Sequence, residues 1–143
     1  MTSSYRKSWR KAKCCMNPLT YEWVAKAEGD FATAGRELRA RRAPNYDAAC
    51  FHAQQCAEKY LKALLQEASI PAGRTHNVIA LLELVLPVDS SWEVMRPHLQ
   101  ALSAFAVSVR YPGESADKAT AREALALCRV IRSYARSRLG LVP

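Results

Sequence analysis

The sequence predicts a single all-α domain, and three observations support this prediction. The chain has 143 residues and only five glycines, so it has the size of one domain and few residues that disfavour helices. Residues 46–69 contain neither Gly nor Pro and are rich in Ala, Leu, Lys, Gln and Glu. Long runs of Ala, Leu, Arg and Glu recur later in the chain. We therefore expect an up-and-down bundle of four to five helices.

Residues 46–69 are expected to form the central helix. At 100° per residue their apolar side chains cover one broad arc, which is typical of a helix that several neighbours surround. His52, Gln55 and Lys59 follow the spacing i, i+3, i+7 and form a narrow polar seam beside this arc. The seam has two interpretations: it holds a nucleotide, or His52 makes a hydrogen-bonded contact between helices. The second is favoured, because buried polar groups are usually satisfied structurally.

Four more helices are predicted around the central one, with no internal repeat and no second domain. Thr20, Asn45, Thr75 and Ser115 are the expected N-caps. Pro97 lies inside one predicted helix and is expected to kink or split it. The predicted flanking helices cover residues 20–41, 76–86, 91–110 and 116–139, and residues 140–143 form a tail.

The charge of the chain is uneven along its length. The formal net charge is +8, with +6 in residues 1–42, −2 in residues 43–121 and +4 in residues 122–143. Basic ends favour an acidic partner, such as nucleic acid, a nucleotide or an acidic protein face. Ordinary solubility explains the same charge equally well.

Residues 1–19 carry five basic and no acidic side chains, and we interpret them as a disordered arm. A nucleic-acid-binding or membrane-surface arm is the alternative. This region has no continuous apolar run of the secretory type, and no later stretch is long and apolar enough to span a bilayer. We expect a cytoplasmic protein without a membrane association.

Metal and cofactor motifs are absent from the sequence. The five cysteines show no metal-ligand spacing, and Cys50, Cys56 and Cys128 occupy core-like positions. No glycine-rich phosphate loop, nucleophile elbow or His-Glu-x-x-His motif is present. We therefore expect no bound metal and no resident cofactor, and a nucleotide is a candidate ligand.

Three motifs resemble landmarks of HEPN domains, small all-α bacterial and archaeal proteins often associated with minimal nucleotidyltransferases. Residues 51–65, FHAQQCAEKYLKALL, resemble the signature helix of that family. Thr75-His76-Asn77 before a leucine-rich helix resembles the second landmark, and Arg110-Tyr111-Pro112 resembles the third. The motifs occur in the family's order within residues 20–139. The resemblance implies a HEPN-like bundle that pairs as a homodimer.

The resemblance also bears on activity. HEPN ribonucleases carry an Arg followed, after four to six residues, by His, and Arg110 is the matching arginine. No histidine follows Arg110, so we expect no ribonuclease activity of that type, because an imidazole moves the protons in that chemistry. The resemblance implies instead a non-catalytic module that binds nucleotide or RNA and acts with a minimal nucleotidyltransferase, in a toxin–antitoxin-like setting.

The alternative functions are a divergent HEPN ribonuclease toxin that uses Arg110 and a pure protein-interaction subunit.

The candidate ligand contacts follow from the seam and the landmarks together. The predicted nucleotide-binding residues are His52, Gln55, Lys59, His76, Arg110 and Tyr111.

Overall fold

The computed structural model describes residues 16–143, and within them the fold is all-α, as predicted. Five α-helices and one short 3-10 helix pack against one another as a bundle. Met16 is buried and α2 begins at Pro18, so the folded part starts before residue 20. Residues 1–15 of the predicted arm lie outside the described residues. The helices are α2 (Pro18–Arg39), α3 (Tyr46–Glu67), α4 (Val78–Val85), η1 (Ser90–Met95), α5 (Arg96–Ser108) and α6 (Lys118–Arg138).

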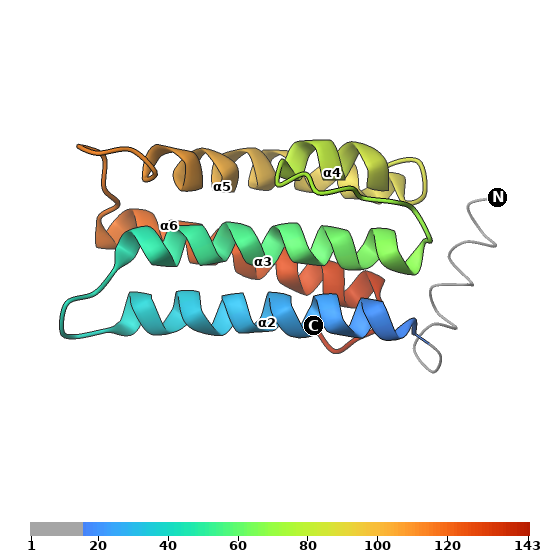
Figure 1. The fold of residues 1–143 in the computed structure, drawn as a ribbon, viewed down its shortest axis with the longest axis horizontal. Coiled ribbons are helices and arrows are strands. Elements are labelled where there is room, and N and C mark those ends of the chain that lie inside the picture. The colour runs from blue at the N-terminus through green and yellow to red at the C-terminus, as the bar shows by residue number, and fades with distance from the viewer. Residues whose placement is uncertain (1–15) are drawn as a thin grey trace.

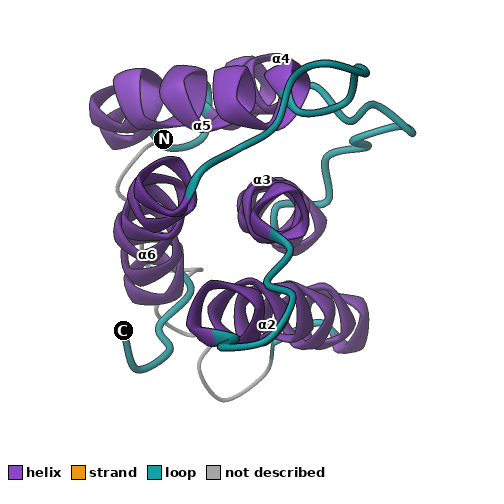
Figure 2. Ribbon diagram, turned by 90° about the vertical axis from the view of Figure 1, so that its left-hand side faces the viewer, coloured by secondary structure: helices purple, strands orange, loops and turns teal. Residues whose placement is uncertain are grey.

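The long helices lie side by side with α3 between the others. Figure 1 shows α2 below α3, the layer of α4 and α5 above it, and α6 behind it. Seen from the end in Figure 2, these neighbours surround α3 on three sides. No described helix covers the fourth side, which faces the viewer in Figure 1. The central position predicted for this helix is therefore correct, with one side left open for polar side chains.

The core is built on the apolar arc of α3. Ala49, Ala53 and Ala57 are buried and let neighbouring backbones approach closely, while Tyr60 and Leu64 fill the wider spaces. The cysteines Cys50, Cys56 and Cys128 are each fully buried, as their core-like positions predicted. Burial raises the pKa of the Cys50 thiol to about 11, so this thiol stays protonated at neutral pH.

Three predicted N-caps were wrong by two or three residues. Asn17, not Thr20, caps α2, and Thr20 is buried with its hydroxyl donating to Glu67 of α3. Asn77, not Thr75, caps α4, because its side-chain oxygen accepts from the backbone N–H groups of Ile79 and Ala80. Asp117, not Ser115, caps α6 through the Thr120 N–H. In each case an Asx side chain takes the cap, which agrees with the preference of Asn and Asp for this position.

Pro97 splits the predicted helix 91–110. The chain forms η1 up to Met95 and begins α5 at Arg96, with the proline in the first turn of α5. Proline is tolerated there because the N–H it lacks would have no partner inside the helix. Trp92 of η1 is fully buried and packs edge-on against Tyr134 of α6. The break therefore lets η1 turn a large aromatic ring into the core.

Two helices end in the same left-handed capping geometry. After α3, Ser69 has a φ of 58°, and the Ile70 N–H donates back to the Leu65 carbonyl at 2.9 Å. After α6, Gly140 has a φ of 77°, and the Leu141 N–H donates to the Arg136 carbonyl at 2.8 Å. This Schellman motif satisfies the last carbonyls of each helix. It directs the chain after α3 toward the loop that precedes α4.

The carboxylate of Glu28 links three helices. Arg132 of α6 donates to its two oxygens, each at 2.7 Å, and the Tyr60 hydroxyl of α3 donates to it at 2.5 Å. Burial alone raises the pKa of Glu28, but these hydrogen bonds and the charges of Arg132 and Arg136 outweigh it. The net effect places the pKa below its ordinary value of 4.5. Arg132 and Arg136 are therefore structural and not part of a free basic face.

Replacing Glu28 with Gln is expected to lower the free energy of unfolding at pH 7 by about 1–2 kcal/mol, because charge-assisted hydrogen bonds are lost. A lowered folded-state pKa stabilises the fold above the ordinary value of 4.5, and this contribution is lost as the pH falls through the folded pKa. Urea denaturation at about pH 7 and pH 3.5 measures both effects. The exposed Glu22→Gln is the control, and equal losses for the two variants would contradict the assignment.

Candidate functional site

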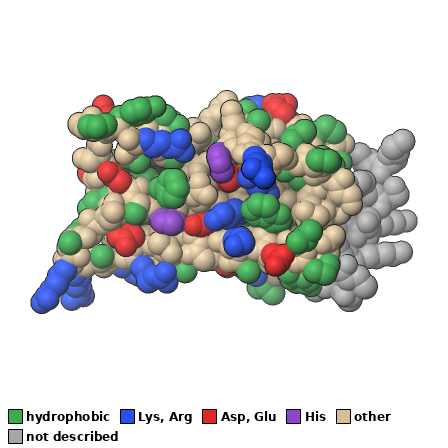
Figure 3. All heavy atoms as spheres, viewed as in Figure 1, with side chains coloured by type: hydrophobic (Ala, Val, Ile, Leu, Met, Phe, Trp, Pro, Cys, Tyr) green, Lys and Arg blue, Asp and Glu red, His purple; other side chains and the backbone are tan. Residues whose placement is uncertain are grey.

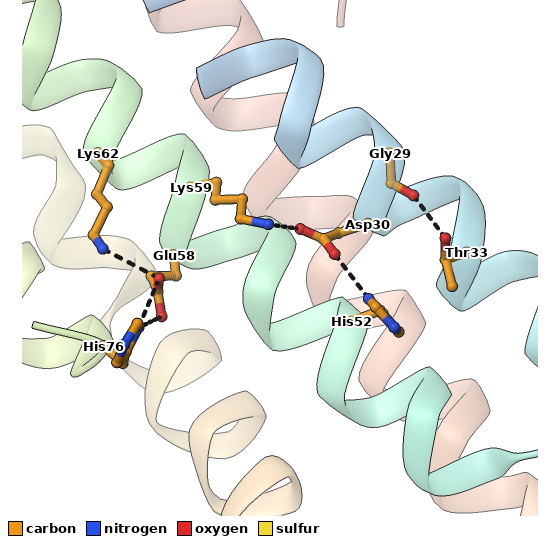
Figure 4. Close-up of polar contacts among 8 residues, drawn as sticks. All are labelled: Gly29, Asp30, Thr33, His52, Glu58, Lys59, Lys62 and His76. Atoms are coloured by element: carbon orange, nitrogen blue, oxygen red, sulfur yellow. Dashed lines mark hydrogen bonds and ion pairs between the residues drawn. The ribbon is translucent and has the colours of Figure 1, made fainter. Parts of the chain in front are cut away.

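Charged side chains gather on the open side of α3. Figure 3 shows histidine, acidic and basic side chains across the middle of the face where α2, α3 and the α4/α5 layer meet. The close-up in Figure 4 resolves them into two clusters, one around Asp30 and one around Glu58. Each cluster contains one carboxylate, one lysine and one histidine. We refer to them as the Asp30 cluster (Asp30, His52, Lys59) and the Glu58 cluster (Glu58, Lys62, His76).

The Asp30 cluster joins α2 to α3. Asp30 is 9% exposed, and its two oxygens contact His52 Nδ1 at 2.8 Å and Lys59 Nζ at 2.5 Å. His52 and Lys59 stand about two turns apart on α3, so one carboxylate from α2 bridges them (Figure 4). This arrangement matches the interpretation of His52 as a hydrogen-bonded contact between helices. It uses the charges of the seam to hold α2 in register with α3.

The Glu58 cluster joins α3 to the loop before α4. Glu58 is only 2% exposed, and its carboxylate contacts Lys62 Nζ at 3.3 Å and His76 Nδ1 at 3.2 Å. A buried carboxylate needs such partners, because an unpaired charge inside a protein is strongly destabilising. Lys62 also lies 5.4 Å from the centre of the Trp23 ring. His76 is 71% exposed, so its other ring nitrogen remains accessible.

A cavity of about 260 Å³ opens next to the Glu58 cluster. Gln54 of α3 and the His76–Asn77 segment form part of its lining, and Ser103 of α5 and Arg110, two residues after the end of α5, also line it. Arg110 is exposed, and within residues 16–143 its guanidinium makes no hydrogen bond or ion pair with another side chain. The cavity therefore combines a free cation, an accessible imidazole and a buried amide.

The structure separates the six predicted nucleotide-binding residues into groups. His76 and Arg110 line the same cavity, as a shared ligand site requires. His52 and Lys59 contact Asp30 and line none of that cavity. Gln55 is half-buried one turn before Lys59. The remaining residue, Tyr111, is 63% exposed, follows Arg110 in sequence and does not line the cavity.

Sequence reasoning missed Gln54, Glu58 and Ser103. Gln54 and Glu58 lie one turn apart on α3 and are 3% and 2% exposed, although polar residues of these types are usually solvated. Both contact His76 in the loop before α4, and helical periodicity does not reveal a contact between these segments. The Thr-His landmark before α4 was the one signal that pointed to this loop.

No group of three or more His, Cys, Asp or Glu side chains within residues 16–143 is arranged to hold a metal ion. In the same part of the chain, no helix combines the length and apolar character needed to cross a bilayer.

Comparison with known proteins agrees with this class of fold, an all-α bundle with polar side chains on its central helix. A family model described as HEPN domain matches residues 20–138, which is most of the chain. The chain belongs to the HEPN domain family. No curated protein and no solved structure matches it.

Replacing Asp30 with Ala is expected to destabilise the fold by about 1–3 kcal/mol, because His52 and Lys59 lose their partner while remaining partly buried. The double variant Asp30→Ala with Lys59→Met is expected to recover part of this loss, because it removes the unpaired lysine as well. Thermal and urea denaturation of Asp30→Ala, Lys59→Met and the double variant measure the recovery. Strict additivity of the single effects would contradict a direct ion pair.

Proposed function

We propose that this HEPN domain protein is a non-catalytic module that binds nucleotide or RNA and acts with a minimal nucleotidyltransferase. The observation that supports the ligand part is that Arg110 and His76 line the same cavity. Among residues 16–143 the exposed Arg110 guanidinium has no side-chain partner, and such a group is suited to bind a phosphate through two parallel hydrogen bonds. The cavity beside it is polar and has room for part of a nucleotide.

The electrostatics of this region favour an anionic ligand. The carboxylate of Glu58 is neutralised by Lys62 and contacts His76, so it presents no free negative charge to the cavity. Arg110 then stands as the cation among the lining residues. Phosphate contacts made by an exposed arginine give binding that weakens with salt. The ligand affinity of this protein is therefore expected to fall as the ionic strength rises.

The partner part of the proposal rests on the family, whose members are often associated with minimal nucleotidyltransferases. The proposal includes a homodimer as the working unit and a toxin–antitoxin-like setting. Size-exclusion chromatography with light scattering, carried out with and without a co-expressed nucleotidyltransferase, tests both protein contacts.

Arg110→Gln is expected to weaken the binding of ATP or a short RNA by about tenfold or more, because a charge-assisted phosphate contact contributes roughly 1.5–3 kcal/mol. Calorimetric titration at low salt measures the affinity. Arg129→Gln removes the same charge from α6 without touching the cavity, and it is expected to leave binding within about twofold of wild type. Equal weakening by both variants would show general attraction, and absent binding by the wild-type protein would end the proposal.

A second candidate function is the divergent ribonuclease, and one observation favours it. The His76 imidazole, from a segment upstream, lines the same cavity as Arg110, whereas the sequence has no histidine after Arg110. Glu58 contacts His76 at Nδ1, which leaves Nε2 as the ring nitrogen able to take a proton from a ribose 2′-hydroxyl. The carboxylate–histidine pair thus has the form of an oriented general base.

Incubation of the pure protein with RNA distinguishes the two candidates. Under the non-catalytic proposal, RNA remains intact after several hours at equimolar protein. Cleavage that ends in 2′,3′-cyclic phosphates and disappears in His76→Ala would replace it with the ribonuclease. His98→Ala is the matched control, because His98 does not line the cavity.

A further inference from the structure

Four arginines gather where the chain leaves α2 and turns toward α3. Arg36 and Arg39 lie in the last turn of α2, and Arg41 and Arg42 follow directly after the helix. All four side chains are exposed. Figure 3 shows basic side chains protruding at the end of the molecule where Figure 1 places the connection between α2 and α3. We refer to these four residues as the arginine turn.

The protein does not neutralise the charge of the arginine turn. Among the described residues, none of the four guanidiniums forms an ion pair, and Arg36 donates only to the neutral hydroxyl of Thr33, at 3.1 Å. The helix dipole stabilises Arg36 and Arg39 in the last turn of α2, but this effect falls off beyond the helix end. Arg41 and Arg42 are therefore left as free cations beside two others.

The backbone that carries these cations is held at both ends. The carboxylate of Glu37 on α2 accepts the N–H of Asn45 at 3.1 Å, and the side chain of Asn45 in turn caps α3 through the Ala48 N–H. Between them Ala43 has a φ of 45°, a conformation that residues with a Cβ atom seldom adopt. Such a conformation persists only where its surroundings determine it. A fixed backbone reduces the ordering that binding requires.

The chemistry of the arginine turn matches phosphate better than other anionic partners. A guanidinium binds phosphate through two parallel hydrogen bonds. Basic membrane-binding segments combine their charge with exposed apolar side chains, and protein interfaces bury an apolar centre. Within the described part of the chain, no large exposed hydrophobic side chain lies in residues 36–45. A row of cations without apolar neighbours is suited to the regularly spaced phosphates of a polynucleotide.

We propose that the arginine turn binds the phosphate backbone of a polynucleotide, RNA in the function proposed above. This inference rests on that function and narrows its ligand from a nucleotide or RNA to a strand with several phosphates. Arg110 follows the end of α5, which lies at the same end of the bundle as the turn (Figure 1). Because phosphate contacts carry no sequence information, binding is tolerant of the base sequence.

The double variant Arg41→Gln/Arg42→Gln tests this inference in the full chain. It is expected to weaken the binding of a labelled oligouridine of about 12 nucleotides at least about tenfold at low salt. Each phosphate contact on a single strand contributes about 0.7 to the slope of log affinity against log salt, so the slope is expected to fall by about 1.4. Fluorescence anisotropy at several salt concentrations measures both quantities. Both arginines are exposed and unpaired, so the fold is expected to be retained, which circular dichroism checks.

The matched control is Lys26→Gln/Arg129→Gln, which removes the same charge from exposed positions on α2 and α6. Lys26 lies about 20 Å along α2 from Arg39. The control is expected to stay within about threefold of wild type and to keep the salt slope. Equal weakening by the two double variants would show general attraction to a basic protein and overturn the role of the arginine turn.

Two competitors identify the source of the anionic groups. Oligothymidine of the same length is expected to compete within about threefold of oligouridine, because the contacts are to phosphates. Poly-L-glutamate at the same concentration of charges is expected to leave the RNA bound. Its displacement of the RNA would assign the turn to an acidic protein partner and overturn the inference. Binding of oligothymidine without oligouridine would overturn RNA as the ligand.

Titration with ATP separates this inference from the function on which it rests. The arginine turn lines none of the cavity that contains Arg110, so Arg41→Gln/Arg42→Gln is expected to bind ATP as the wild type does. Wild-type protein that binds ATP but not oligouridine overturns the arginine turn as an RNA site and leaves nucleotide binding in place. Absence of binding of both up to about 1 mM overturns both proposals.

Discussion

A carboxylate buried on the central helix is the constraint on which the rest of the site depends. Glu58 is 2% exposed, and a charge at this depth must be compensated by groups that the fold itself provides. Lys62 supplies one partner from the same helix, and His76 supplies the other from the loop that follows α3. The loop is therefore bound to α3 by electrostatics as well as by packing. Together with α5, this loop lines the cavity to which Gln54 and Arg110 also contribute.

The two clusters on α3 show how one set of residue types serves two purposes. In the Asp30 cluster the histidine and the lysine of α3 both contact the Asp30 carboxylate of α2, so the cluster is a contact between two helices. The Glu58 cluster has the same composition but ends in an exposed histidine next to a cavity. Exposure, rather than residue identity, distinguishes the structural cluster from the one that can meet a ligand. The spacing of His52 and Lys59 in the sequence marked a contact between helices, because both side chains contact Asp30 of α2.

Much of the fold followed from the sequence because helical periodicity and proline positions are local signals. The apolar arc of residues 46–69 predicted the central helix, and Pro97 marked the point where η1 gives way to α5. The caps were missed because Asn17, Asn77 and Asp117 compete with nearby Ser and Thr, and only the backbone geometry decides between them. Burial of Gln54 and Glu58 was not predictable, because it arises from contacts between segments that no periodicity relates.

The left-handed residue after α3 has a consequence for the architecture of the cavity. Gly140 ends α6 without a steric penalty, whereas Ser69 adopts the same geometry at a cost of about 1 kcal/mol for a residue with a Cβ atom. The strain is tolerated because the Ile70 N–H pairs with Leu65 and sends the chain toward His76. The backbone conformation at Ser69 therefore sets the direction of the chain that leads, seven residues later, to His76. A substitution at position 69 would therefore act on the loop that carries His76 without altering any residue that lines the cavity.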